Sequence, residues 1–399
     1  MKQDFGEAGL KETGFSARKE WMNMQQIRIG IIGTGFTIGI AKSHYDGYTK
    51  CDKTNVVALY DILPGRSEAF AQRHKIEGVT ICSSLDELFS MVDAVSLCVP
   101  NCFHADLAVK ALEAGKHVLV EKPFSTDAET GKKAVEAAKA HPELVAMTSF
   151  NYREQSAVQY MKEIVDSGVL GPIRFVRHHG GGGRIANAER VYLEWRMRKE
   201  TSGTGSLADF GAHMLDLSDW MLGEQCGKFV SYSAVTTTSI PERYVIDGES
   251  VMGEKKGDEK GPVTNDDTAA FTAVTDKGVL FTFLTSRINH GGADFEIIGE
   301  YGAISNSTKW PRGTIGMSLT NAPLPGETEI KWGMHPIPIP EKYMGEGTQG
   351  VQHYGVICEF ADCILNGTKP VRDLERGLFI QQEIDNFAKA AEEGRTITV

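Results

Sequence analysis

A strand that runs directly into a glycine-rich turn is the feature that most constrains the fold of this chain. Residues 27–32 include four isoleucines, and the next seven residues contain Gly33, Gly35 and Gly39. In a dinucleotide-binding turn the first glycine permits a tight bend and the second lets the backbone approach a pyrophosphate. Amides at the start of the following helix then bind the anion. The turn, with Phe36 and Thr37, is therefore a candidate cofactor site, although its third glycine comes one position later than usual.

Strand-like and helix-like segments alternate through the first 150 residues. The expected strands are residues 55–60, 80–82, 94–99, 118–120 and 144–148, and the expected helices between them are 85–91, 104–114 and 127–139. This alternation predicts a doubly wound parallel sheet. The second strand ends at Asp61, whose carboxylate would accept hydrogen bonds from both ribose hydroxyls and repel a 2′-phosphate. Because the nearby Arg66 is expected in the next helix, the sequence favours NAD over NADP.

Two more loops are predicted to meet at the carboxyl edge of this sheet, where open α/β sheets bind ligands. One contains Pro100, Asn101 and His104, and we interpret His104 as a helix-start residue near the cofactor. The other is Glu121-Lys122-Pro123, which follows the strand 118–120. Proline fixes the direction of the chain, so the ammonium group of Lys122 is expected in the crevice. A solvated Glu-Lys pair is the alternative for this dipeptide taken alone.

A second candidate site lies in residues 202–216, where glycines and serines precede an apolar helical pattern. Asp209 and His213 are four residues apart, which would place both on one helix face. Asp216 continues that face and could orient the imidazole, which titrates near neutrality and can accept a hydroxyl proton. Read alone, an aspartate and a histidine at this spacing are more often a surface pair.

The rest of the second half predicts a mostly antiparallel sheet. Expected strands cover residues 173–177, 230–236, 269–274, 279–285 and 295–299, and expected helices cover 354–366 and 374–393. We interpret residues 178–184 as a flexible loop beside the cleft, because His178 and His179 have no partner at metal-ligand spacing; no metal site is expected. Residues 253–262 read as an inserted charged surface loop, and 310–350 as irregular covering structure. The predicted domains are a dinucleotide-binding domain over 26–150 and a substrate-binding and oligomerisation domain over 151–399.

Composition narrows the possible partners. The formal net charge of the 399 residues is −11, the wrong sign for binding nucleic acid or an anionic membrane. No apolar run is long enough to span a bilayer, and residues 1–25 lack the apolar core of a secretory signal, so they are expected to be a loosely ordered extension. The seven cysteines are scattered without a Cys-x-x-Cys pair, which favours reduced thiols in a cytoplasmic protein.

Three motifs in this order resemble those of the Gfo/Idh/MocA oxidoreductases. They are the glycine turn at Gly33, the Glu121-Lys122-Pro123 motif, and a third motif that runs from Gly203 through Asp209 and His213 to Asp216. The resemblance covers residues 27–399. It implies a Rossmann domain followed by an α/β domain with a large open sheet, and hydride transfer between a nicotinamide and a carbinol carbon of a sugar or polyol.

The same resemblance implies roles for individual residues. Lys122 would hold the reacting hydroxyl, His213 would be the acid/base, and Asp209 would bind substrate, with Asn151 and Arg153 as further substrate-binding candidates. A homo-oligomer, dimer or tetramer, is expected from the exposed sheet face. Two other functions stay open: a redox-neutral enzyme that retains NAD and oxidises a glycoside ring at C3, and a non-catalytic NAD-binding regulator.

Overall fold

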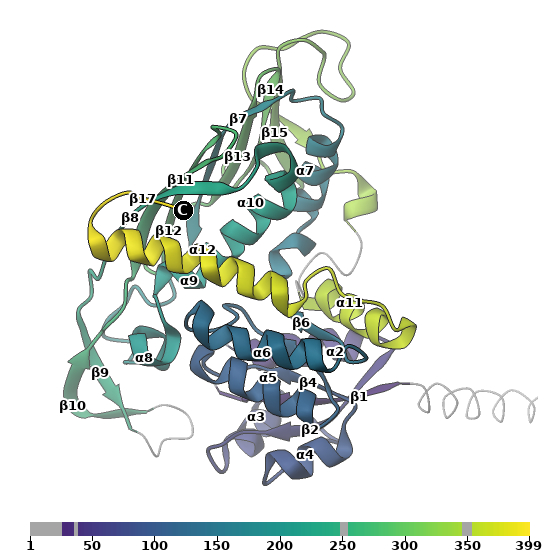
Figure 1. Cartoon of the computed structure of the whole chain (residues 1–399), viewed down its shortest axis with the longest axis vertical. Helices are drawn as coiled ribbons and strands as arrows, with labels where there is room; N and C mark the ends of the chain where they lie inside the picture. The colour runs from purple at the N-terminus through teal and green to yellow at the C-terminus, as the bar shows by residue number, and fades with distance from the viewer. Residues whose placement is uncertain (1–25, 36–38, 248–253, 345–352) are drawn as a thin grey trace, which may run out of the picture.

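Two β-sheets, one parallel and one mostly antiparallel, organise the protein. The computed structural model describes residues 26–35, 39–247, 254–344 and 353–399. In Figure 1 the parallel sheet with its helices forms the lower part of the molecule, and the larger sheet forms the upper part. The long helix α12 (Leu374–Glu393) crosses the region between them.

The first sheet contains six parallel strands in the order β3-β2-β1-β4-β5-β6. Its central strands are buried on both faces, as continuous apolar runs in a parallel sheet require. The order reverses between β1 and β4, so the crevice for a ligand opens beyond their carboxyl ends. The strands are β1 (Ile27–Ile32), β2 (Thr54–Tyr60), β3 (Thr80–Ile81), β4 (Ala94–Leu97), β5 (His117–Val120) and β6 (Ala146–Thr148). The helices are α2 (Ile40–Lys50), α3 (Arg66–His74), α4 (Leu85–Met91), α5 (His104–Glu113) and α6 (Ala128–Ala140).

The second sheet has nine strands in the order β16-β15-β14-β13-β7-β12-β11-β8-β17. Its neighbours run antiparallel except β7 and β12, which are parallel. The strands are β7 (Ile173–Gly181), β8 (Phe229–Thr237), β11 (Thr268–Thr275), β12 (Leu280–Ser286), β13 (Asp294–Gly299), β14 (Gly302–Ser307), β15 (Thr314–Leu319), β16 (His335–Pro338) and β17 (Ile397–Thr398). The predicted α/β fold with a parallel and a large, mostly antiparallel sheet is thus confirmed.

Helices cover one face of the large sheet (Figure 1). Aromatic rings fill the space between sheet and helices: Phe271 stacks on Phe283 at 4.7 Å, and Phe387 of α12 meets Phe271 edge-on at 4.8 Å. The remaining helices of this half are α7 (Ser156–Asp166), α8 (Lys199–Ser202), α9 (Ser206–Asp209), α10 (Gly211–Cys226) and α11 (His353–Asn366). Short 3-10 turns occupy Asn101–Phe103, Asn151–Glu154, Trp195–Met197 and Glu341–Tyr343.

The last two helices connect the two halves. Helix α11 packs on α2 of the parallel-sheet half, and α12 contacts α6 there while covering β8 of the large sheet. A buried cluster around Ile357 and Phe360 of α11 joins the core beneath β1. None of the helices in the described ranges is long and apolar enough to cross a membrane.

Four local predictions were wrong. Lys255–Pro262, expected to be a loop, is strand β10 and pairs with β9 (Glu242–Ile246). This charged segment lacks the alternation of apolar and polar residues that is typical of a strand. The reason is that β9 and β10 form a separate two-stranded hairpin that covers little of the hydrophobic core. Residues 178 and 179 continue strand β7, and His178 is buried against Phe295. Between residues 310 and 350, β15 and β16 extend the edge of the large sheet. Asp209 and His213 lie on separate helices, since α9 ends at Asp209 and α10 begins at Gly211.

Candidate active site

A cavity of about 990 Å³ lies between the two halves, at the carboxyl edge of the parallel sheet. Its walls come from the glycine turn, the ends of β2, β4 and β5, the start of α10 and the segment before α8. Eleven of the predicted site residues line it: Gly33, Gly35, Asp61, Pro100, Asn101, His104, Glu121, Lys122, Asn151, Asp209 and His213. Phe36 and Thr37 lie outside the described residues.

The glycine turn leaves room for a ligand. Gly33 has φ +91, and a Cβ there would lie 2.7 Å from the carbonyl oxygen of Cys98, so only glycine fits. At Gly35 an added Cβ would meet nothing within 4 Å, which means that the backbone faces open space. Gly39, with φ +74, is the residue that precedes helix α2. The late third glycine therefore sets where the helix begins, and the open backbone at Gly35 fits the approach of a pyrophosphate.

Asp61 is fixed at the end of β2 on the cavity wall. Its carboxylate accepts hydrogen bonds from the backbone amides of Thr34 at 2.9 Å and Leu63 at 3.0 Å. Arg66 begins α3, as expected, but its guanidinium lies 3.8 Å from the same carboxylate. A cation is thus closer to the ribose position than the sequence suggested. The anchored carboxylate fits a pair of ribose hydroxyls.

The loop after β4 ties the two halves together. Asn101 donates a hydrogen bond from its amide to the carbonyl oxygen of Ser202 at 2.9 Å. His104 begins α5, as predicted, and its ring nitrogens lie 2.9 Å from the carbonyl oxygen of Pro123 and 3.0 Å from that of Val99. His104 therefore positions the segment that follows Lys122, and its backbone partners leave it no proton-transfer role.

Lys122 and Asp209 form the central charged pair of the cavity. The Lys122 ammonium donates to the Asp209 carboxylate at 2.8 Å and to the Asp209 carbonyl oxygen at 2.9 Å. The second oxygen of Asp209 accepts a hydrogen bond from Arg287 at 3.2 Å. Burial alone would raise the pKa of Asp209, but Lys122, Arg287 and Arg196 outweigh it and hold that pKa well below its usual range. Asp209 is therefore ionised across the physiological pH range and balances the positive charge beside it.

The position of Asp209 depends on the capping of α9. The carboxylate of Asp266 accepts hydrogen bonds from the backbone amides of Gly205 at 2.6 Å and Leu207 at 2.8 Å. A Cβ on Gly205 would lie 1.7 Å from the Asp266 carbonyl oxygen, so the close approach of the two segments requires glycine. The glycine and serine residues that precede Asp209 in the sequence are thus the residues that let this short helix dock.

His213 is buried beside the charged pair. Its ring stacks on Tyr152, with centroids 3.7 Å apart and planes nearly parallel. Burial, with the neighbouring Lys122 ammonium, holds the pKa of His213 well below its usual value. The imidazole is therefore neutral at neutral pH and able to accept a proton. Its Nδ1 is buried without a hydrogen-bond partner among the described residues, so the ring is held by stacking.

The prediction that Asp216 orients this imidazole is wrong. Its carboxylate is buried and bound instead by Arg153, at 2.8 and 2.5 Å, and by Arg376 at 2.9 Å. Arg153 consequently faces the packing between α10 and α12 and does not line the cavity. The spacing rule failed here because two arginines distant in sequence compete for the carboxylate, and a charge-assisted pair is stronger than a bond to neutral imidazole.

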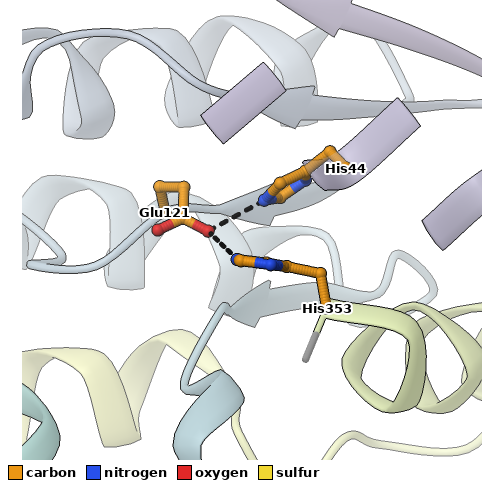
Figure 2. Close-up of side chains that lie close together, drawn as sticks. All are labelled: His44, Glu121 and His353. Atoms are coloured by element: carbon orange, nitrogen blue, oxygen red, sulfur yellow. Dashed lines mark hydrogen bonds and ion pairs between the residues drawn. The ribbon is translucent and has the colours of Figure 1, made fainter. Parts of the chain in front are cut away.

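Glu121 is the centre of a buried group that the sequence did not reveal. One of its oxygens lies 2.8 Å from Nε2 of His44 and 3.2 Å from Nε2 of His353 (Figure 2). The three residues come from α2, the end of β5 and the start of α11. Within the described parts of the chain, this is the one group of three side chains of metal-ligand type whose ligand atoms lie within 4.8 Å of one another.

Several lining residues were not anticipated from the sequence. They include Tyr152, Arg184, Arg196, Arg287 and His353. Tyr152 directly follows Asn151, which was predicted to be a site residue, so its position near the site could have been predicted from the sequence. The other four residues come from segments whose sequence pattern predicts a strand or a helix and gives no indication of a site. Their approach to the cavity depends on tertiary packing.

A two-sheet architecture with a glycine turn, an anchored carboxylate at the end of β2 and a Lys–Asp–His group across the cavity defines a dinucleotide-binding oxidoreductase. The family described as "Oxidoreductase family, NAD-binding Rossmann fold" matches residues 27–149, and the GFO/IDH/MocA C-terminal domain matches residues 158–305. The chain belongs to the Gfo/Idh/MocA oxidoreductase family, and NAD is its cofactor.

Individual relatives agree with this assignment. The chain is 30% identical over 303 residues to levoglucosan dehydrogenase of Pseudarthrobacter phenanthrenivorans, covering 70% of this chain and 73% of the relative. It is 31% identical over 220 residues to D-glucoside 3-dehydrogenase of Escherichia coli K12, covering 53% and 59%. A solved structure of levoglucosan dehydrogenase in its apo form superimposes with a TM-score of 0.80 at 25% identity, covering 94% of this chain and 99% of the other.

Proposed function

We propose that this protein is an NAD-dependent dehydrogenase that transfers a hydride between a ring secondary alcohol of a sugar, glycoside or inositol and nicotinamide. The observation that carries the proposal is that Lys122, just after β5 of the parallel sheet, meets Asp209 and His213 of the other half in a cavity that also has the features of a dinucleotide site. The named relatives are dehydrogenases of levoglucosan and of D-glucosides, which supports a carbohydrate substrate.

The proposed division of labour follows from charge and protonation. A hydroxyl group must lose its proton as its carbon loses hydride, so a cation is needed for the developing alkoxide and a base for the proton. Lys122 supplies the cation, since its ammonium is already held in the cavity by Asp209. His213 supplies the base, because burial keeps its imidazole neutral. Asp209 holds Lys122 in place and offers acceptor oxygens to substrate hydroxyls.

The cofactor would occupy the wall made by the first sheet. The turn at Gly33 and Gly35 would bind the pyrophosphate, Asp61 the adenosine ribose, and the segments at Pro100, Asn101 and Glu121 the remainder. NAD supplies the hydride acceptor when it is bound. The chain's own residues orient it and handle the proton.

A redox-neutral enzyme with retained NAD is the second candidate. The same three residues serve it, because both reactions begin with oxidation of a ring carbon. A non-catalytic regulator is disfavoured by the intact Lys122–Asp209 pair beside a neutral His213. The experiment is a screen of inositols, hexoses, anhydrosugars and aryl glycosides for an absorbance rise from NADH. Steady NADH release supports the dehydrogenase. Turnover of a glycoside with NAD bound and none released supports the redox-neutral enzyme.

We also propose a homo-oligomer, dimer or tetramer, that joins through the uncovered face of the large sheet. That face carries the exposed apolar side chains of Val235 on β8 and Leu280 and Leu284 on β12, and clustered apolar groups of this kind mark contact surfaces. A cytoplasmic location and a division into domains at residues 26–150 and 151–399 complete the proposal. Light scattering at micromolar concentration tests the assembly, and a monomer would contradict it.

A further inference from the structure

The group formed by His44, Glu121 and His353 borders the proposed active site without belonging to its reacting residues. Glu121 and His353 line the cavity, whereas His44 lies behind them and is completely buried. Glu121 directly precedes Lys122, and one of its carboxylate oxygens lies 3.2 Å from the Lys122 backbone amide. The group therefore joins helix α2, the end of β5 and helix α11 at Glu121, next to the residue that carries the central ammonium (Figure 2).

The proton positions in this group follow from its partners. A carboxylate only accepts hydrogen bonds, so His44 must donate its Nε2 proton to Glu121 at 2.8 Å. The neutral ring then has an acceptor at Nδ1, and Ser96 must donate to it at 2.9 Å. The Ser96 hydroxyl in turn accepts from the Tyr48 hydroxyl at 2.7 Å. Each donor in this chain from Tyr48 to Glu121 has an acceptor, which leaves the His44 ring in one orientation.

A hydrogen-bonded group explains these distances better than a metal site. Ligands about 2.0–2.1 Å from a tetrahedral metal lie about 3.3 Å from one another. The His44–Glu121 distance is 2.8 Å and the His353–Glu121 distance is 3.2 Å, and all the ligand atoms of the group lie within 4.8 Å of one another. The distances from Glu121 to the two histidines both lie in the range of N–H···O hydrogen bonds, and they share a single acceptor oxygen.

We propose that His44 and His353 are positioning residues for Lys122. By donating to one oxygen of Glu121, the two imidazoles hold that buried carboxylate in place, and its second oxygen fixes the backbone at Lys122. The proposal rests on the function proposed above, because it assigns Lys122 to the reacting hydroxyl. Neither histidine touches substrate or cofactor in this role.

Charge supports the proposal. Burial would raise the pKa of Glu121, but the hydrogen bonds from His353 and His44 outweigh burial and hold that pKa well below its usual value. Without those donors a buried carboxyl group takes up a proton near neutrality. A protonated Glu121 would lose its hold on the neighbouring amide. The other titratable groups that face Glu121 are Cys98 on the β4 edge, His104 on α5, His213 on α10 and its neighbour Lys122.

The test compares His44→Leu and His353→Leu with His44→Gln, His353→Gln and Glu121→Gln. The matched control is His117→Gln, which changes a half-buried histidine at the opposite end of β5. For each protein, kcat and KM of sugar oxidation are measured from pH 5 to 9, together with NAD affinity. The leucine variants should lose roughly 10- to 100-fold in kcat, as misplacement of a reacting group typically costs, with KM changed less. The acidic limb of their pH profiles should move to higher pH.

Two comparisons distinguish positioning from simple destabilisation. The glutamine variants, which can still donate an N–H to Glu121, should recover part of the lost kcat. His44→Leu should lower kcat less in the Glu121→Gln variant than in the unchanged protein, since both changes act through the same carboxylate. A lower unfolding temperature with unchanged kcat and pH profile would overturn the proposal, and so would equal losses in the His117 control.

Two further measurements do not depend on finding a substrate. The difference in the pH dependence of unfolding between a variant and the unchanged protein reports the contribution of Glu121: the stability from its low folded pKa is present above the unfolded value and is lost as pH falls through the folded value. His44→Leu should shift that loss to higher pH. If no sugar is oxidised in the screen but this shift is found, the proposed function is wrong, whereas the conclusion that His44 and His353 hold the Glu121 carboxylate remains supported. Metal analysis of the purified protein should find no stoichiometric ion, and an ion that His44→Leu removes would replace this proposal with a metal centre.

Discussion

The two halves of the molecule place their functional residues by different means. On the parallel-sheet side, Gly33, Gly35 and Asp61 lie where strands end and turns begin, so chain connectivity alone brings them to one edge. On the other side, Asp209 and His213 reach the cavity only because α9 docks through Gly205 on Asp266 and because Arg287 comes from the end of a distant strand. The cofactor wall is local in sequence, whereas the reacting wall depends on tertiary packing.

This difference predicts that changes to the two reacting residues, Lys122 after β5 and His213 of α10, abolish turnover and leave cofactor binding intact. Lys122→Ala should lower kcat about 10²–10³-fold, the usual cost of losing a preorganised charge. His213→Ala should lower it about 10²–10⁴-fold, the usual cost of losing a general base. NAD affinity, measured by fluorescence titration, should change little in both variants, because neither side chain is proposed to contact the pyrophosphate or ribose.

The double variant sharpens the test. Since Lys122 and His213 act on one hydroxyl, Lys122→Ala combined with His213→Ala should lose much less than the product of the single losses. Near-normal turnover in Lys122→Ala would contradict the proposed function. Loss of NAD binding in that variant would make Lys122 a structural residue and would blur the distinction between the two walls.

The pH profile of the unchanged protein is a second consequence of the reacting wall. Because the pKa of His213 lies well below its usual value, its base form should persist well below pH 6.5. The rate of sugar oxidation should therefore show no loss as pH falls from 8 to 6.5. It should fall only at lower pH, as the imidazole takes up a proton. A limb centred at 6.5 that His213→Ala removes would show that the imidazole is exposed to solvent during turnover.

The core of the second half contains a carboxyl group whose pKa is also shifted, but this group is not part of the candidate site. Glu383 of α12 is buried and accepts a hydrogen bond from the Tyr232 hydroxyl at 3.0 Å. Burial raises the pKa of Glu383 to about 7. The stability that protonated Glu383 contributes is therefore fully present below the pKa that this group has in the unfolded chain, and it is lost as pH rises through about 7. A perturbed carboxyl group can thus belong to packing alone.

Glu383→Gln should accordingly stabilise the protein at high pH. The amide stays neutral and still offers an oxygen to Tyr232, so the gain in unfolding free energy should approach about 2–3 kcal/mol at pH 8 and be small at pH 5. Chemical denaturation at the two pH values measures it. Turnover should be unchanged, and a pH-independent difference in stability would mean that Glu383 is not ionising in this range.

The same contrast explains what the sequence could predict. The order of strands and helices, the cofactor turn, Asp61 and the lysine at the end of β5 all follow from local patterns, and Leu374–Glu393 forms the predicted last helix. The partners of Asp216 could not be predicted, because Arg153 and Arg376 flank it from opposite directions along the chain. His44 and His353 contact Glu121 because α11 packs on α2. No local sequence pattern predicts that packing.

The smallest expected effect belongs to the cofactor wall, where a local change should alter selectivity alone. Asp61→Ser removes the carboxylate that would face a 2′-phosphate and leaves Arg66, now 3.8 Å from that carboxylate, on the same side of the cavity. The preference for NAD over NADP should fall by at least about fivefold, since a charged group left without its partner typically costs 1–3 kcal/mol. The measurement is the ratio of dissociation constants for the two cofactors in the variant and the unchanged protein. Asp61→Asn is the matched control, because it keeps an acceptor oxygen for the ribose and removes only the charge. If equal affinities for NAD and NADP were found before any change, the role of Asp61 would be wrong even though its position on the cavity wall is as predicted.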